Sequence, residues 1–310
     1  MAIGLYSSTY GIVLKEAKQH LKIILSAVTV GVFLKALFIG SILSWLFHDP
    51  FFFLLGIMVA QIDPLSVSKL MHGTRLSAKA KTILASWASF DDPITVILCL
   101  YAPILLAQIT GSEWLSLTDI DKNANGIQGY LDVFLFNLGF AGLVFLIWKL
   151  SKKQLANRLL RSSHIALLGG SIAVTVSQLW MLSVALIGLF LRPPIDLFIE
   201  KAIQWSLRMA AILLGVLLVS GVNLLYGVAL GIAAFTAQIL VGMLLTRGLV
   251  GKDRIHIAFA QQNGITAIIL SLLFEPLYPR TVSIIAPAIL VINTIHAVSN
   301  QLLDRFVLQK

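Results

Sequence analysis

The chain has 310 residues, of which 58% are hydrophobic and only 12% are charged, and its mean hydropathy is +0.92. A soluble domain is nearer half apolar and a quarter charged, so this composition excludes one and predicts a multi-pass protein in a lipid bilayer. The net charge of +9 does not indicate nucleic-acid binding, because the basic residues gather in short loops between apolar runs. The single cysteine, Cys99, excludes an internal disulfide framework.

The first half of the chain contains four predicted membrane spans. Residues 2–14 are apolar but too short to cross the hydrocarbon core, which is roughly 30 Å thick. The spans that follow are expected at about 23–47, 51–71, 82–108 and 129–149. The loops after the last three are basic, acidic and basic in turn, so we expect the lysine-rich loops on the cytoplasmic side.

The second half begins with residues 164–191, a stretch without Asp, Glu, Lys or Arg. One long helix is the simpler interpretation of it. Two short crossings, broken near Ser177-Gln178, are favoured because they place the next basic loop on the cytoplasmic side. Further spans are expected at about 198–220, 222–246, 254–274 and 281–302, and they leave the C-terminus in the cytoplasm.

Together these spans predict an all-α polytopic bundle of about ten transmembrane helices. The whole chain, 1–310, is expected to form a single transporter domain. Within it, residues 1–22 would be the remnant of an N-terminal helix, 23–149 the helices of a first repeat, and 150–310 the second half. The predicted location is the bacterial inner membrane.

Two apolar spans carry carboxylates where the helix is expected to break. The motifs are Gln61-Ile62-Asp63-Pro64 and Phe90-Asp91-Asp92-Pro93. A charged side chain at bilayer depth costs about 2.5–3.5 kcal/mol on insertion scales, and no basic residue adjoins these three aspartates. An ion or proton site is therefore favoured, and hydrogen-bonded structural carboxylates are the alternative.

A second interruption lies in the predicted span 254–274, which contains Gln261, Gln262, Asn263 and Gly264. Interrupted helices in both halves of a chain point to an inverted-repeat secondary transporter with its site near the bilayer midplane. Freed backbone carbonyls and helix ends there can replace the water around a cation. On its own the amide run could be a packing kink. It supports an ion site because a second interrupted span, at Asp63, is present in the other half of the chain.

Neighbouring residues of a helix point about 100° apart, so Asp91 and Asp92 are expected to face different partners. Burial favours the neutral form of a carboxylate, and nearby carboxylates titrate as a coupled set. A deprotonated site binds a hard monovalent cation through oxygen ligands, whereas a protonated site releases it. Competition between a proton and a cation for the same oxygens is sufficient for antiport.

At these residues the chain resembles the monovalent cation:proton antiporter superfamily of sodium/proton exchangers. The family's Thr-Asp-Pro crossover reads Ile62-Asp63-Pro64 here, and its Asn-Asp or Asp-Asp pair reads Asp91-Asp92, twenty-nine residues on (63 to 92). The resemblance covers nearly the whole chain. It implies that Asp92 is the main cation and proton ligand with Asp63 beside it, and that the aspartate at 91 is the version associated with electrogenic exchange. The proposed site is Asp63, Asp91 and Asp92, with backbone and amide support expected from Gln61, Ile62, Gln262, Asn263 and Gly264.

The chain departs from the family pattern at its buried charges. Trp87 and Asn263 occupy the places of a glutamate and an arginine that pair in other members, so both charges are absent together. Gln238 lies where the family tends to have a lysine or arginine before the second crossover. Lys35 or Arg208 could supply the counter-charge that the first aspartate of the pair then lacks, and a packing or snorkelling lysine is the alternative for Lys35.

The N-terminus departs as well. Residues 2–5 resemble the end of the family's third helix, which predicts that the first helices of the family are missing from this chain. The resemblance implies a possible homodimer, although the helices expected to be missing commonly help to form the dimer interface of the family.

Two weaker patterns are present. Asp121, Asn123, Asn125 and Asp132 match calcium-loop positions 1, 3, 5 and 12, with a solvated turn as the alternative. Most of the histidines are interpreted as ordinary interfacial residues, but His72 and His256 lie in segments expected on the cytoplasmic side and could sense pH.

The sequence therefore predicts a secondary antiporter that exchanges Na⁺ or K⁺ for H⁺ by alternating access and serves pH homeostasis. Its only expected ligands are the transported ions. No nucleotide-binding glycine loop or nucleophile elbow is present, so no cofactor and no enzyme activity are predicted. The alternatives are a transport-inactive membrane protein or sensor of the same fold, and a passive channel.

Overall fold

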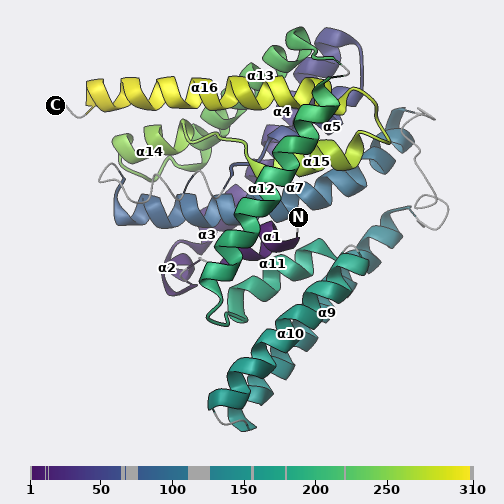
Figure 1. Cartoon of the computed structure of the whole chain (residues 1–310). Coiled ribbons are helices and arrows are strands. Elements are labelled where there is room, and N and C mark those ends of the chain that lie inside the picture. Colours follow the sequence, from purple (N-terminus) through teal and green to yellow (C-terminus); the bar gives the residue numbers. More distant parts are fainter. Residues whose placement is uncertain are drawn as a thin grey trace. The chain divides into compact units, whose positions relative to one another are not determined.

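The computed structural model describes residues 2–10, 12, 14–63, 67, 76–110, 126–154, 157–178, 180–219 and 221–307 (Figure 1). Every regular element within these ranges is a helix. The chain divides into two compact units. We call Val13–Cys99 with Leu207–Lys310 the motif unit, because it contains all three aspartates, and Met1–Ile12 with Leu100–Ser206 the hairpin unit.

The motif unit is an assembly of helices from both ends of the sequence. Its described helices are α2 (Leu14–Gln19), α3 (Leu21–Ser26), the π-helix η1 (Ala27–Gly31), α4 (Val32–Phe47), α5 (Phe51–Val59), α13 (Leu224–Leu245), α14 (Gly251–Ala258), α15 (Ile265–Phe274) and α16 (Thr281–Val307). The first part of α7 (Ala78–Thr110) and the second part of α12 (Asp196–Leu218) also belong to it.

The hairpin unit contains α1 (Ala2–Tyr10), α9 (Gly126–Gln154), α10 (Asn157–Ser177) and α11 (Met181–Phe190). α9 and α10 contact each other and lie side by side in Figure 1. α10 ends at Ser177, so the predicted break near Ser177-Gln178 is confirmed. Arg192, just after α11, connects the two sequence segments of this unit. Its guanidinium donates to the carbonyl of Ile12, after α1, at 2.8 Å and to the carbonyl of Gly188, in α11, at 3.1 Å.

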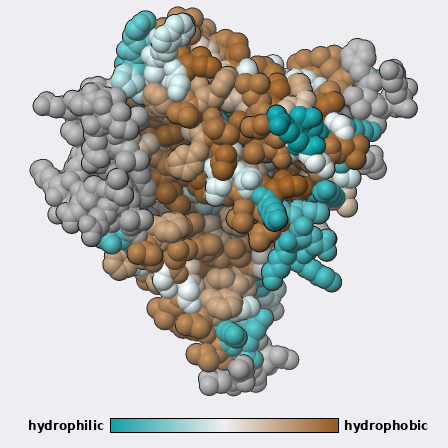
Figure 2. Space-filling model, turned by 180° about the vertical axis from the view of Figure 1, so that it is seen from behind, coloured by the Kyte–Doolittle hydropathy of each residue, from teal (hydrophilic) through white to brown (hydrophobic). Residues whose placement is uncertain are grey.

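Within the described residues, five helices are long and apolar enough to cross a membrane: 21–47, 78–99, 134–152, 224–245 and 281–303. Large hydrophobic side chains are exposed along them, and hydrophobic residues cover most of the described face in Figure 2. A soluble protein rarely exposes apolar surface on this scale, so lipid is the natural solvent for these helices. The chain is a multi-pass membrane protein, as its composition predicts.

Glycines allow the helices of the motif unit to pack closely. A Cβ added to Gly227 of α13 would lie 2.4 Å from Cγ of Pro287, and one added to Gly231 would lie 2.8 Å from Cβ of Val291. Close approach at small residues is a usual way for membrane helices to associate. α13 and α16 are thereby held together, and they also contact α14 and α15, respectively.

Two spans are interrupted, and one predicted interruption is wrong. α5 ends at Val59 and non-helical chain continues to Asp63, while residues 259–264 separate α14 from α15. In contrast, α7 is helical through Pro93, where the sequence predicted a break. A proline removes one backbone hydrogen bond, and a long, packed membrane helix tolerates that loss because its neighbours compensate for it.

Candidate ion-binding site

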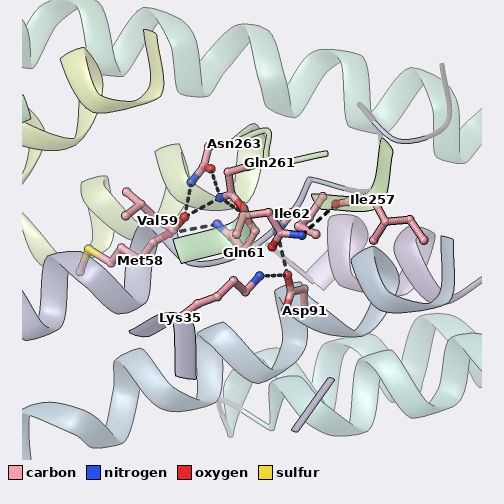
Figure 3. Close-up of polar contacts among 10 residues, drawn as sticks. Lys35, Met58, Val59, Gln61, Ile62, Asp91, Ile257, Gln261 and Asn263 are labelled. Carbon is pink, nitrogen blue, oxygen red and sulfur yellow. Dashed lines mark hydrogen bonds and ion pairs between the residues drawn. The ribbon is translucent and has the colours of Figure 1, made fainter. Parts of the chain in front are cut away.

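The two interrupted spans meet at their non-helical segments. The backbone N–H of Asp63 donates to the carbonyl of Gln262 at 2.8 Å. The side-chain amide of Gln261 donates to the carbonyls of Val59 at 2.9 Å and Gln61 at 2.8 Å (Figure 3). Carbonyls that lack a helical partner are therefore satisfied by the other segment, as buried backbone groups require.

Asn263 extends this network to α16. Its side-chain amide donates to the carbonyl of Val59 at 3.2 Å and accepts from the Gln261 amide at 2.9 Å. Asn293 of α16 makes two hydrogen bonds to the backbone of Asn263. Oδ1 of Asn293 accepts from the Asn263 N–H at 3.1 Å, and the Asn293 side-chain NH₂ donates to the Asn263 carbonyl at 2.9 Å. The amide run found in the sequence thus fastens three elements together.

Asp92 is 2% exposed and accepts hydrogen bonds from both broken spans. Its Oδ2 accepts from the hydroxyl of Thr266, in the first turn of α15, at 2.8 Å. Its Oδ1 accepts from the Gln61 amide at 2.7 Å in the orientation that also lets the Gln61 oxygen accept from the Ala267 N–H at 2.8 Å. We assign this orientation, because the reverse one in Figure 3 offers the amide only the Met58 carbonyl at 3.3 Å.

Asp91 faces a different partner, as the helical spacing predicts. Its Oδ2 accepts from Nζ of Lys35 at 2.8 Å and from the backbone N–H of Ile62 at 2.9 Å (Figure 3). Both side chains of the ion pair are fully buried, and the ammonium lies 5.3 Å from the ring centroid of Trp87. Asp91 therefore has a counter-charge from α4, the helix before the first interrupted span.

The Asp63 carboxylate lies against Gly264 of the opposite segment. A Cβ added to Gly264 would be 2.4 Å from Cγ of Asp63 and 2.5 Å from its Oδ2, so a side chain here would displace the carboxylate. Asp63 is 5% exposed and interacts electrostatically with Asp92. Two buried carboxylates near the N-terminal, positive end of α15 repel each other, and a cation or a proton between them relieves that repulsion.

Two further side chains support the second interrupted span. The Gln238 amide on α13 donates to the carbonyl of Ile257 at 3.1 Å. Nδ1 of His296 on α16 lies 2.9 Å from the carbonyl of Phe259. His296 is buried, so it is an exception to the interpretation of most of the histidines as ordinary interfacial residues.

The sequence did not single out Asn293, His296 or the role of Thr266. A signal for the first two was present, because Asn293, His296 and Asn300 recur at i, i+3 and i+7 in an otherwise apolar span and so share one helix face. Thr266 lies three residues after Asn263, but nothing local shows which carboxylate it contacts.

The other predicted residues are placed elsewhere. Gln262 contributes its backbone carbonyl to the crossing. Arg208 is exposed on α12, and His256 is buried on α14. Of the calcium-loop residues, Asp132 is exposed on α9, whereas Asp121, Asn123 and Asn125 lie outside the described residues, as does His72.

Comparison with known proteins identifies a solved structure with a similar fold. No protein-family model matches the chain, and no curated protein matches it. The solved structure of the sodium proton antiporter MjNhaP1 from Methanocaldococcus jannaschii at pH 8 is similar, with a TM-score of 0.71 and 16% sequence identity. The similarity covers 98% of this chain and 81% of the other. The chain therefore has the all-α fold of a polytopic antiporter, which confirms the fold implied by the sequence motifs.

Proposed function

We propose that this protein is a secondary antiporter that exchanges a monovalent cation, Na⁺ or K⁺, for H⁺ by alternating access. The position of Asp92 carries this proposal. One oxygen of this buried carboxylate is bonded to the first interrupted span, and the other is bonded to the second. Interrupted helices that cross at bilayer depth are the usual place for ion sites in secondary transporters. The fold shared with a sodium proton antiporter supports the same function.

Asp92 and Asp63 form the proposed substrate site. Their ionised carboxylates attract a cation, while the Gln61 amide nitrogen and the Thr266 hydroxyl donate hydrogen bonds to the two oxygens of Asp92. When Asp92 takes up a proton, this attraction is lost and the cation leaves. Occupancy by one ion therefore excludes the other, and this competition couples the two fluxes.

The Lys35–Asp91 pair has a separate role in this proposal. Its two charges cancel within the buried site, so the exchange of ions is left to Asp63 and Asp92. If both of these carboxylates release a proton for each monovalent cation bound, each cycle moves two positive charges one way and one the other. The exchange is then electrogenic, as the Asp91-Asp92 motif implies.

Vesicles containing the purified protein provide the test. An acidic interior is imposed, NaCl or KCl is added outside, and proton efflux is followed with a pH-sensitive dye. Asp92→Asn keeps the shape of the side chain but removes its charge, so we expect exchange to fall to the level of protein-free vesicles. Asp132→Asn is the matched control, because this aspartate is exposed on α9 and should exchange normally. Normal exchange by Asp92→Asn would falsify the site assignment.

The same assay separates the alternatives. Cation flux without proton movement indicates a passive channel. Absence of any flux in the unaltered protein, together with thermal stabilisation by Na⁺ or K⁺, indicates a transport-inactive sensor. For location we propose the cytoplasmic membrane of a bacterium, with the C-terminus on the cytoplasmic side, because the lysine-rich loops follow the positive-inside pattern.

A further inference from the structure

The two oxygens of Asp92 have chemically different partners. Oδ1 accepts from the Gln61 amide nitrogen, and Oδ2 accepts from the Thr266 hydroxyl. An amide NH₂ group can only donate, whereas a hydroxyl donates or accepts by rotating about its C–O bond. The two oxygens are therefore not equivalent for binding a proton.

The amide of Gln61 cannot readily turn over to accept a proton from Asp92. Its oxygen already accepts from the Ala267 N–H at 2.8 Å, and reversal would place the NH₂ against that N–H. A proton on Oδ1 of Asp92 would likewise face the Gln61 NH₂, so two donors would oppose each other in a buried site. A proton on Oδ2 meets no such conflict, because the Thr266 hydroxyl can rotate and accept it.

We propose that Thr266 is the proton-side partner of Asp92: its hydroxyl donates to the ionised carboxylate and accepts from Oδ2 when that oxygen is protonated. Thr266 thereby sets the pH at which exchange is activated. No proton is transferred to Thr266; only the direction of its hydroxyl hydrogen changes when Asp92 gains or loses its proton. This inference rests on the proposed antiport function and assigns to Thr266, at the start of α15, a part in its proton step.

The direction of the effect follows from hydrogen-bond strength. A bond to a charged acceptor is roughly twice as strong as one between neutral groups, so the hydroxyl stabilises ionised Asp92 more than protonated Asp92. Without the hydroxyl the proton is held more tightly and competes with the cation up to a higher pH. We expect the pH of half-maximal exchange in Thr266→Val to rise by about one unit, a tenfold increase in proton affinity.

The other charged groups around Asp92 stay the same in this variant. They are Asp63 from the first interrupted segment and Asp91 from the same helix, the latter paired with Lys35. His296 is a further titratable group packed against the second interrupted segment, against which Asp63 also lies. A change in the pH profile of Thr266→Val therefore reports the lost hydroxyl.

The experiment measures exchange in vesicles between pH 5.5 and 9.5 at several Na⁺ or K⁺ concentrations. Thr266→Val should shift the profile to higher pH and raise the apparent KM for the cation at low pH, with KM within about twofold of normal at the alkaline limit. Thr266→Ser retains a hydroxyl and should restore the normal profile. Thr246→Val is the matched control, because the hydroxyl of this buried threonine donates to the carbonyl of Gly242 in its own helix, at 2.6 Å, and the variant should not shift the profile.

Thr266→Ala is measured in parallel, and the variant whose thermal unfolding matches the unaltered protein is used. The inference is wrong if the chosen Val or Ala variant exchanges with an unshifted pH profile. It is also wrong if the pH profile of Thr266→Ser shifts as far as the profile of the chosen variant; in both cases the proposed antiport function still stands. If the unaltered protein does not exchange at all, the proposed function fails before any variant is considered. The dependence of cation-induced thermal stabilisation on pH, measured in detergent, provides a second readout that needs no transport.

Discussion

The ion pair between Lys35 and Asp91 gives the sharpest quantitative prediction. Both side chains are fully buried, and the ammonium lies 2.8 Å from the carboxylate, which also accepts from the Ile62 N–H. Removal of one partner from such a pair leaves a buried charge without compensation, at a cost of about 3–5 kcal/mol. We expect Lys35→Met and Asp91→Asn each to lower the free energy of unfolding by this amount.

The double variant separates the charge from the packing. With both charges removed, no ion is left unpaired, and we expect Lys35→Met/Asp91→Asn to lose only about 1–2 kcal/mol. The two single effects should therefore exceed the double effect by several kcal/mol, a coupling that direct contact permits and distant sites do not show. Lys79→Met is the control, because Lys79 is exposed on α7, and it should change stability by less than about 0.5 kcal/mol.

Thermal unfolding of the purified protein in detergent is the assay. By the scaling for domains of this size, a loss of 3–5 kcal/mol corresponds to a fall in the apparent Tm on the order of 10 °C. The reasoning is refuted if Lys35→Met unfolds at the same temperature as the unaltered protein, or if the two single effects simply add in the double variant. Either result would mean that the two side chains are not a buried pair in the folded protein.

Two further predictions concern close contacts of the motif unit. Gly264→Ala should abolish or severely reduce exchange and cost about 1–3 kcal/mol of stability, because its Cβ would displace the Asp63 carboxylate; Gly248→Ala, with open space around it, should behave normally in the same vesicle and unfolding assays. Asp253→Ala should cost about 1–2 kcal/mol, because this buried carboxylate accepts from both the N–H and the hydroxyl of Ser77, just before α7, at 3.0 Å and 2.5 Å. An unchanged Tm would show that these two hydrogen bonds do not contribute to stability.

Part of the site was evident from the sequence because its signals are local. The interruption at Asp63 and the amide run before Gly264 each break an apolar run that would otherwise be helical, and both breaks are present in the structure. The divergent orientation of Asp91 and Asp92 follows from helix geometry alone. The prediction of a break at Pro93 is wrong because it also used only local information. A local rule for proline cannot show whether surrounding helices compensate for one lost hydrogen bond.

The membrane character of the chain and the two interruptions, at Asp63 and before Gly264, could be read from the sequence alone, since each depends on hydrophobicity and helix breaking within a few neighbouring residues. The choice of Lys35 over Arg208 as the partner of Asp91, and the contact of Thr266 with Asp92, were decided only by the tertiary structure. These pairs lie 56 and 174 residues apart in the chain. Which side chains meet over such separations depends on how whole helices pack and cross, and no periodicity within a single segment encodes that.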